Sequence, residues 1–209
     1  MAAAPETEVE MNDTATTLDA EVETESNVII QDVASDAKKI GFLRWEKVTK
    51  HPGPYSLQRS SSPNYDGKQD KSQRITAAGI AFLQKQIILH VICLNSDAMS
   101  SYEIGHELAN ASPRIAFTHI PVQDYHSPTL QEMEKGYQAY VGAKKNTLVW
   151  CGYGWGRTGT MITALQYKIE KAKGKVVKLS HSDYLSNHVE QYHQGVSTGQ
   201  YETLDALQK

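Results

Sequence analysis

The chain has 209 residues and a formal charge of −3, with 40% hydrophobic and 22% charged residues, which is ordinary for a soluble globular protein. No apolar run is long enough to cross a bilayer, so we expect no integral membrane segment. The first ten residues lack the basic and apolar regions of a Sec-type signal peptide, although a signal-independent export route stays open. Two cysteines, Cys93 and Cys151, are too few for a disulfide framework. They favour a reducing compartment, so we expect a cytoplasmic protein.

The charge is distributed unevenly along the chain. Residues 1–37 hold ten acidic residues and no Lys or Arg, so the rest carries 14 acidic and 21 basic residues, a formal charge of +7. A segment rich in Thr, Ala and Glu buries too little apolar surface to offset the entropy of ordering it. We therefore predict a disordered acidic tail over residues 1–38 and one folded domain over residues 39–209. The positive charge of the domain is consistent with an anionic substrate, and equally with an ordinary solvated surface of mixed charge. We expect no nucleic-acid partner.

The folded part alternates between strand-like and helix-like patterns. In chain order these patterns predict strands over residues 42–48 and 55–59, a polar loop over 60–73, a helix from Thr76 to Gln86, a strand over 87–94, a helix that opens with Ser100 and Glu103 as a capping box, a strand over 115–122, a helix capped by Thr129 and Glu132, a strand over 147–151, and helices near 161–171, 183–192 and 200–208. This alternation predicts an α/β fold with a mainly parallel central sheet flanked by helices. Ligands of such folds bind beyond the carboxyl ends of the strands.

A glycine-rich loop follows the strand over residues 147–151. Its residues are Cys151, Gly152, Tyr153, Gly154, Trp155, Gly156 and Arg157, and Thr158 follows. Strand, tight turn and helix place the loop at a helix N-terminus, where unpaired backbone N–H groups and the helix dipole favour an anion. The same field favours the thiolate form of a cysteine. The pattern therefore predicts a nucleophile inside an anion-binding loop.

An acidic residue lies at the end of the preceding predicted strand. Asp124 belongs to the segment Ile120-Pro121-Val122-Gln123-Asp124-Tyr125-His126-Ser127-Pro128. Because the carboxyl ends of parallel strands share one edge, we expect this carboxyl near Cys151. Such a group could transfer a proton to or from a reacting oxygen. The alternative interpretation of Asp124 is a turn residue.

Together these residues resemble the cysteine-dependent protein tyrosine and dual-specificity phosphatases, most closely the small dual-specificity branch. The resemblance covers roughly residues 59–207 and includes Arg59-Ser60-Ser61-Ser62-Pro63. It implies that residues 39–209 are a catalytic domain with Cys151 as nucleophile and Asp124 as general acid. It also implies that the loop from Gly152 to Arg157 binds phosphate and that Thr158 assists breakdown of the intermediate. We expect no metal or other cofactor.

The predicted function is hydrolysis of phosphotyrosine, with phosphoserine and phosphothreonine as further substrates, in a protein or peptide through a phosphocysteine intermediate. An inositol-phosphate or phosphoinositide phosphatase is the alternative enzyme. The loops of those branches commonly carry Lys or His, and none stands between Cys151 and Arg157. A catalytically inactive phospho-binding module is the alternative of another class. Such modules usually lack the cysteine, the arginine or the acid, and this chain has all three.

Several further residues allow two interpretations. The residue before the cysteine is usually His in the resembling family, but here it is Trp150, which predicts a differently tuned thiol. Cys93 is either a buried small apolar residue or a reversible disulfide partner of Cys151. Trp155 could pack in the core or line the pocket. We interpret Gln200 as structural, and we interpret as solvated residues His126, Tyr65, Lys68, Lys71 and Arg74.

Overall fold

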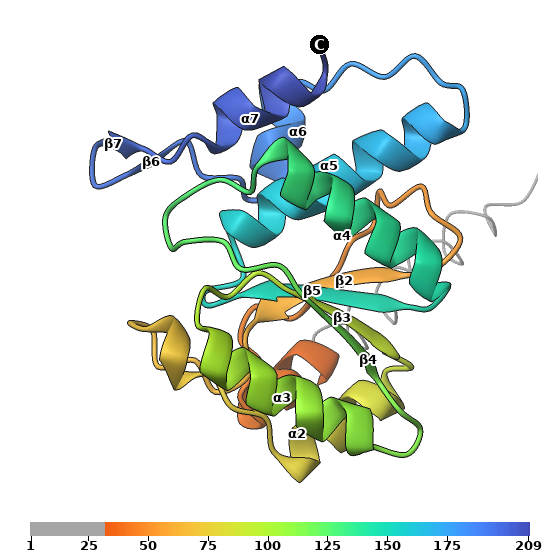
Figure 1. The fold of residues 1–209 in the computed structure, drawn as a ribbon, viewed down its shortest axis with the longest axis vertical. Helices are drawn as coiled ribbons and strands as arrows, with labels where there is room; N and C mark the ends of the chain where they lie inside the picture. Colours follow the sequence, from red (N-terminus) through yellow and green to blue (C-terminus); the bar gives the residue numbers. More distant parts are fainter. Residues whose placement is uncertain (1–31) are drawn as a thin grey trace, which may run out of the picture.

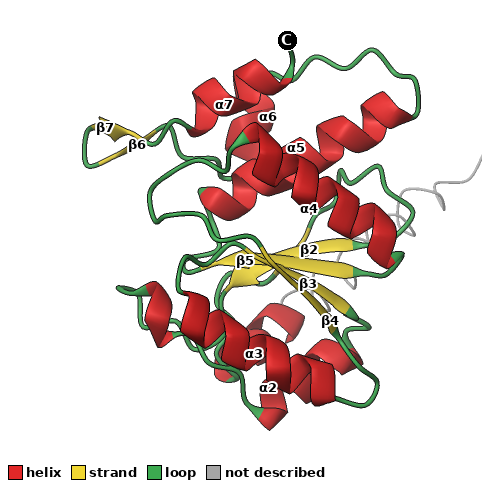
Figure 2. Ribbon diagram, viewed as in Figure 1, coloured by secondary structure: helices red, strands yellow, loops and turns green. Residues whose placement is uncertain are grey.

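The computed structural model describes residues 32–209, which build a five-stranded sheet between two layers of helices (Figures 1 and 2). The strands are β1 (Glu46–Lys47), β2 (Leu57–Ser61), β3 (His90–Cys93), β4 (Ala116–His119) and β5 (Thr147–Cys151). Their order is β1-β2-β5-β3-β4. All neighbouring pairs are parallel except β1 with β2. The predicted α/β class with a mainly parallel sheet is confirmed, and β5 lies at its centre.

The helices are divided between the two faces of the sheet. One face carries the short 3-10 helix η1 (Asp70–Ser72), α2 (Ala77–Lys85) and α3 (Ala98–Asn110). The other carries α4 (Leu130–Ala143), α5 (Arg157–Ala172), α6 (His181–Ser186) and α7 (Gln200–Leu207). A two-stranded hairpin, β6 (Tyr192–His193) and β7 (Val196–Ser197), projects beyond α7. No helix among these residues is long and apolar enough to span a membrane.

Hydrophobic clusters lie on both faces of the sheet, and β5 contributes side chains to both of them. Successive residues of a strand point to opposite faces, so Trp150 packs with the cluster beneath α2 and α3, whereas Cys151 belongs to the cluster beneath α4 and α5. The Trp150 ring lies 6.2 Å from the rings of both Phe42 and Phe117, measured between centroids. Cys93 is aligned with Trp150 in the register of β3 and β5 and shares its cluster. Since Cys93 and Cys151 therefore lie on opposite sides of the sheet, the interpretation of Cys93 as a buried apolar residue holds in this fold.

Two of the three predicted helix caps are confirmed. Thr76 caps α2, and Thr129 with Glu132 forms the predicted capping box of α4. The predicted box of Ser100 and Glu103 is wrong, because α3 begins earlier. Asp97 is its N-cap, with a carboxylate that accepts hydrogen bonds from both the backbone N–H and the hydroxyl of Ser100.

The structure also differs from the predicted boundaries at the start of the domain and at the end of α6. Residues 32–39 form a helix whose Ala37 is fully buried, so the predicted boundary at residue 38 falls inside this helix. The rest of the predicted tail, residues 1–31, lies outside the described residues. The helix predicted near residues 183–192 is the shorter α6, because the chain then turns into the β6–β7 hairpin.

Candidate active site

The loop from Cys151 to Arg157 joins β5 directly to α5. The backbone N–H of Gly154 donates to the Cys151 sulfur at 3.2 Å, and the thiol donates to the Trp155 carbonyl at 3.3 Å. Gly154 has φ of +93° and Gly156 has φ of +44°, values that favour glycine. The predicted arrangement of strand, tight turn and helix is therefore present, with the sulfur enclosed by the loop.

Arg59 of β2 supports the loop from behind. Its guanidinium donates to the carbonyl oxygens of Gly154 and Asn187, each at 2.8 Å, although no carboxylate is among its hydrogen-bond partners in the described residues. The arginine is almost completely buried. Burial lowers its pKa, an effect that the negative charges of Glu46 and Cys151 oppose. Arg59 of β2 therefore ties the loop from Cys151 to Arg157 to this strand and to the segment that follows α6.

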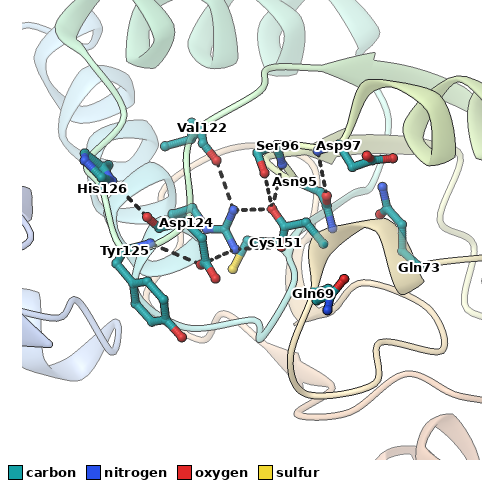
Figure 3. A network of polar contacts seen from close by, with 12 residues as sticks. Gln69, Gln73, Asn95, Ser96, Asp97, Val122, Asp124, Tyr125, His126 and Cys151 are labelled. Carbon is teal, nitrogen blue, oxygen red and sulfur yellow. Dashed lines mark hydrogen bonds and ion pairs between the residues drawn. The ribbon is translucent and has the colours of Figure 1, made fainter. Parts of the chain in front are cut away.

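Arg157 is held by two carboxylates and a carbonyl. Its Nη1 atom donates to Asp70 Oδ2 at 2.7 Å and to the Val122 carbonyl at 2.9 Å. Its Nη2 atom lies 3.0 Å from Asp70 Oδ1 and 2.6 Å from Asp124 Oδ1. Ser96 in turn donates to Asp70 Oδ2 from both its backbone N–H and its hydroxyl at 2.7 Å. Figure 3 shows this network around Val122, Ser96, Asp124 and the Cys151 sulfur.

The charges of this network reinforce one another. Burial alone would lower the pKa of Arg157, yet Cys151 in its thiolate form and the carboxylates of Asp70 and Asp124 raise it above its usual value. Burial alone would raise the pKa of Asp70, but the Arg157 guanidinium and the Ser96 hydrogen bonds hold it below its usual value. Both side chains are almost fully buried. The site therefore contains a permanent cation whose orientation is fixed by a buried carboxylate.

A pocket of about 320 Å³ opens above the sulfur. It is lined by Tyr65, Gly67, Asp124, Tyr125, Cys151, Tyr153, Trp155, Gly156, Arg157, Glu190, His193 and Gln200. Trp155 lines it, and its ring stacks on His188 with centroids 4.9 Å apart. Tyr125 stacks on His193 at 3.7 Å. Four of the twelve lining residues are therefore Tyr or Trp, and Arg157 is the one lining residue in the described part of the chain that carries a permanent positive charge.

Part of the sequence matches a known protein family. Residues 69–200, more than half of the chain, match the family PTP-SAK, described as Swiss Army Knife protein, DSP-PTPase phosphatase domain. The chain belongs to the PTP-SAK family. No relative was found among curated proteins.

Three solved structures are similar to this PTP-SAK domain, and two of them, with TM-scores above 0.5, share its fold. A putative phosphatase from Shewanella putrefaciens CN-32 is 16% identical with a TM-score of 0.54, and the match covers 80% of this chain and 90% of that one. Protein tyrosine phosphatase TbPTP1 of Trypanosoma brucei is 16% identical with a TM-score of 0.52, covering 81% and 73%. PTPMT1, solved in complex with PI(5)P, is 14% identical with a TM-score of 0.49, covering 78% and 94%. The fold is that of dual-specificity-type phosphatases.

The PTP-SAK fold brings three of the four predicted catalytic residues into one pocket, namely Cys151, Arg157 and Asp124. Tyr153, Trp155 and Gly156 of the predicted phosphate-binding loop also line this pocket. Thr158 follows at the start of α5, and its hydroxyl is buried without a hydrogen-bond partner among the described residues. Trp150 points to the opposite face of the sheet from Cys151 and does not line the pocket. The residue before the cysteine therefore contributes to the core.

Sequence reasoning missed two acidic residues of this PTP-SAK site. Asp70 fell within the segment predicted as a polar loop. The sequence contains many acidic residues, and no local pattern distinguishes Asp70 from the others. Glu190 fell within the predicted helix near residues 183–192, but it lies after α6 and lines the pocket. Tyr65, interpreted as solvated, also lines the pocket and lies over Gly152. These positions depend on long-range packing that local patterns do not contain.

Gly154 provides a direct test of the loop geometry in this PTP-SAK domain. A Cβ at this position would lie 2.6 Å from backbone atoms of Ser60 and Ser61. The positive φ adds a cost for any other residue. We expect Gly154→Ala to destabilise the domain by about 2 kcal/mol and to misplace the loop around Cys151. Urea unfolding and phosphatase assays measure the two effects.

Gly174→Ala is the matched control for this change. Gly174 has φ of +77°, yet nothing lies within 4 Å of an added Cβ, so only the backbone cost applies. Gly174→Ala should therefore keep full activity and lose less stability than Gly154→Ala. Equal stability losses together with full activity of both variants would contradict the close approach of the loop to β2.

Proposed function

We propose that this PTP-SAK domain hydrolyses phosphotyrosine, and also phosphoserine and phosphothreonine, in proteins through a phosphocysteine intermediate. One observation carries the proposal. A single pocket with aromatic walls contains the Cys151 sulfur, the Arg157 guanidinium and the Asp124 carboxylate. Since both cysteines are free thiols, we place the reaction in a reducing compartment, the cytoplasm.

In the first step the Cys151 thiolate attacks phosphorus as the bond from phosphorus to the tyrosine oxygen breaks. The guanidinium of Arg157 and the loop N–H groups bind the other phosphoryl oxygens, where negative charge accumulates. In the second step water attacks phosphorus, the bond from phosphorus to sulfur breaks, and phosphate leaves. The Thr158 hydroxyl, which has no partner among the described residues, could assist this departure of the thiolate.

Asp124 has a role that depends on its contact with Arg157. Each Nη atom of arginine carries two hydrogens. Three of the four donate to Asp70 or Val122, and Asp124 Oδ1 forms an ion pair with Nη2 at 2.6 Å. A phosphate that takes a second donor besides Nε must therefore displace one of these partners. Asp124 is the more exposed carboxylate, with 33% of its side chain accessible, against 7% for Asp70. We propose that phosphate displaces Asp124, which takes up a proton from solvent once it has left Arg157 and gives that proton to the leaving oxygen.

The pocket walls favour an aryl phosphate over a highly charged substrate. Tyr65, Tyr125 and Tyr153 offer surfaces for a phenyl ring. Asp124 and Glu190 add negative charge at the same entrance, and Arg157 is the permanent cation of the lining. Additional phosphates on an inositol ring would therefore meet carboxylates rather than lysines.

A substrate panel tests the proposed function. The protein is assayed with a phosphotyrosine peptide, a phosphoserine peptide, a phosphoinositide and inositol hexakisphosphate, and Cys151→Ser is the control. We expect the phosphotyrosine peptide to be cleaved fastest and Cys151→Ser to be inactive. Faster cleavage of the inositol substrates would overturn the substrate class. Binding of phosphopeptide without cleavage would indicate an inactive phospho-binding module.

Asp124→Ala tests the acid assignment. Poor leaving groups need a proton as their bond to phosphorus breaks, whereas activated phenolates leave without one. We expect turnover to fall by about 10²-fold for phosphotyrosine and much less for an activated aryl phosphate. A series of aryl phosphates with different leaving-group pKa values measures the dependence. An equal loss across the series would count against Asp124 as the acid.

A further inference from the structure

A third acidic residue, Glu190, faces the pocket of Cys151 and Arg157 from the segment that follows α6. Its backbone N–H donates to Gln200 Oε1 at 3.0 Å, and its carbonyl accepts a hydrogen bond from the Thr198 hydroxyl. The residue is therefore fixed through both of its backbone groups. Its side chain is directed at the active-site loop by this anchoring.

The Glu190 carboxylate lies directly above the last glycine of the loop. A Cβ at Gly156 would lie 2.9 Å from Glu190 Oε2 and 3.2 Å from Gln200 Nε2. The amide Nε2 carries two hydrogens, one of which is directed to the His126 carbonyl at 3.4 Å. Among residues 32–209 the Glu190 carboxylate has no hydrogen bond or ion pair of its own. The Glu190 carboxylate, which can accept a hydrogen bond, and the Gln200 amide, which can donate one, therefore both lie at Gly156, the residue before Arg157.

The two carboxyl groups of the pocket lining, those of Asp124 and Glu190, differ in their ion pairing. Asp124 is in contact with Arg157 at 2.6 Å, whereas Glu190 is unpaired and half-buried in the described part of the chain. Burial raises the pKa of Glu190, and the charge of Asp124 adds to this effect. The positive charges of His193 and Arg157 act in the opposite direction. A carboxylate whose pKa is closer to neutrality is the stronger base.

We propose that Glu190 is a further catalytic residue, the general base that activates water for hydrolysis of the phosphocysteine. The proposal rests on the proposed function above. The water oxygen bonds to phosphorus as the phosphorus–sulfur bond breaks, and the electron pair of that bond stays on sulfur as the Cys151 thiolate. One water proton passes to the Glu190 carboxylate and returns to solvent after phosphate leaves. Asp124 serves the first step and Glu190 the second.

Transient kinetics of Glu190→Gln tests this division of roles. We expect kcat for a phosphotyrosine peptide and for p-nitrophenyl phosphate to fall by about 10²-fold. KM should fall with it, because only the step after phosphorylation is slowed, so kcat/KM stays close to wild type. Rapid quenching should then find most of the enzyme phosphorylated on Cys151. Glu202→Gln, an exposed change on α7, should behave like wild type.

The same experiment defines the results that overturn the proposal. A Glu190→Gln variant with wild-type kcat would show that the carboxylate only lines the pocket. A loss of kcat/KM that grows with leaving-group pKa, without accumulated phosphoenzyme, would assign Glu190 to the first step instead. Circular dichroism of each variant excludes misfolding, and Glu190→Asp should restore part of kcat if a carboxylate is required. A wild-type protein that cleaves none of the substrates would refute the proposed function itself, which separates the two failures.

Discussion

Replacement of Arg157 by lysine should reduce phosphatase turnover by about 10³-fold, although the positive charge is retained. The reason is geometric. Arg157 presents a planar fork that Asp70 fixes through two hydrogen bonds of 2.7 and 3.0 Å. A lysine ammonium is a point charge that cannot hold Asp70 and bind two phosphoryl oxygens at once. Steady-state kinetics with a phosphotyrosine peptide measures the loss.

Arg44→Lys is the matched control for this change. The Arg44 guanidinium lies 3.2 Å from the centroid of the Tyr153 ring and donates to the Tyr153 carbonyl at 3.0 Å. It borders the same loop but does not line the pocket. We expect its turnover to stay within a few-fold of wild type. If Arg157→Lys were equally active, Arg157 would not bind the transferring phosphoryl group.

Asp70→Asn should have the largest effect on stability, with a parallel loss of activity. The change removes the negative charge that faces a buried guanidinium, and breaking a buried ion pair costs about 3 kcal/mol or more. The new side-chain amide could still accept one hydrogen bond, but it would place its own hydrogens against Arg157 or Ser96. Urea unfolding at neutral pH measures the stability, and KM for a phosphotyrosine peptide measures the misplacement of Arg157.

The effect of Asp70→Asn should depend on pH. The pKa of Asp70 is lowered in the folded state, so its contribution to stability is present above the ordinary carboxyl pKa and is lost as pH falls through the folded value. The difference between wild type and variant should therefore shrink below about pH 4. Asp36→Asn removes an exposed ion pair with Lys39 and should unfold at the wild-type urea concentration. Equal behaviour of the two variants would contradict a buried pair.

Much of the fold follows from local patterns in the sequence. The apolar run before Cys151 predicts β5 with the bounds that the structure shows, because a buried central strand needs continuous apolar residues. Thr129 and Glu132 predict the start of α4, because a capping box satisfies backbone donors locally. Asp97 shows where this reasoning fails, since Asp97 and Ser100 both suit an N-cap and the helix length depends on packing of α3 against the sheet.

The residues of the candidate site also fall into those that local sequence patterns predict and those that depend on tertiary packing. Cys151 and Arg157 are recognisable because one loop contains both, and Asp124 because it follows a predicted strand. Asp70 and Glu190 are 81 and 39 positions from Cys151 in the sequence. Only tertiary packing brings Asp70 against Arg157 and Glu190 to the pocket. The sequence also does not predict which side of the sheet Cys93 faces, because this depends on the register of β3 against β5.

In the proposed reaction the Cys151 sulfur carries the phosphoryl group during turnover. Wild-type protein is mixed with an aryl phosphate, quenched under denaturing conditions within the first turnover, and digested for mass spectrometry. We expect the peptide containing Cys151 to gain the mass of one phosphoryl group and the Cys151→Ser protein to show no such gain. Turnover of the substrate without phosphate on Cys151, or phosphate on another residue, would contradict it.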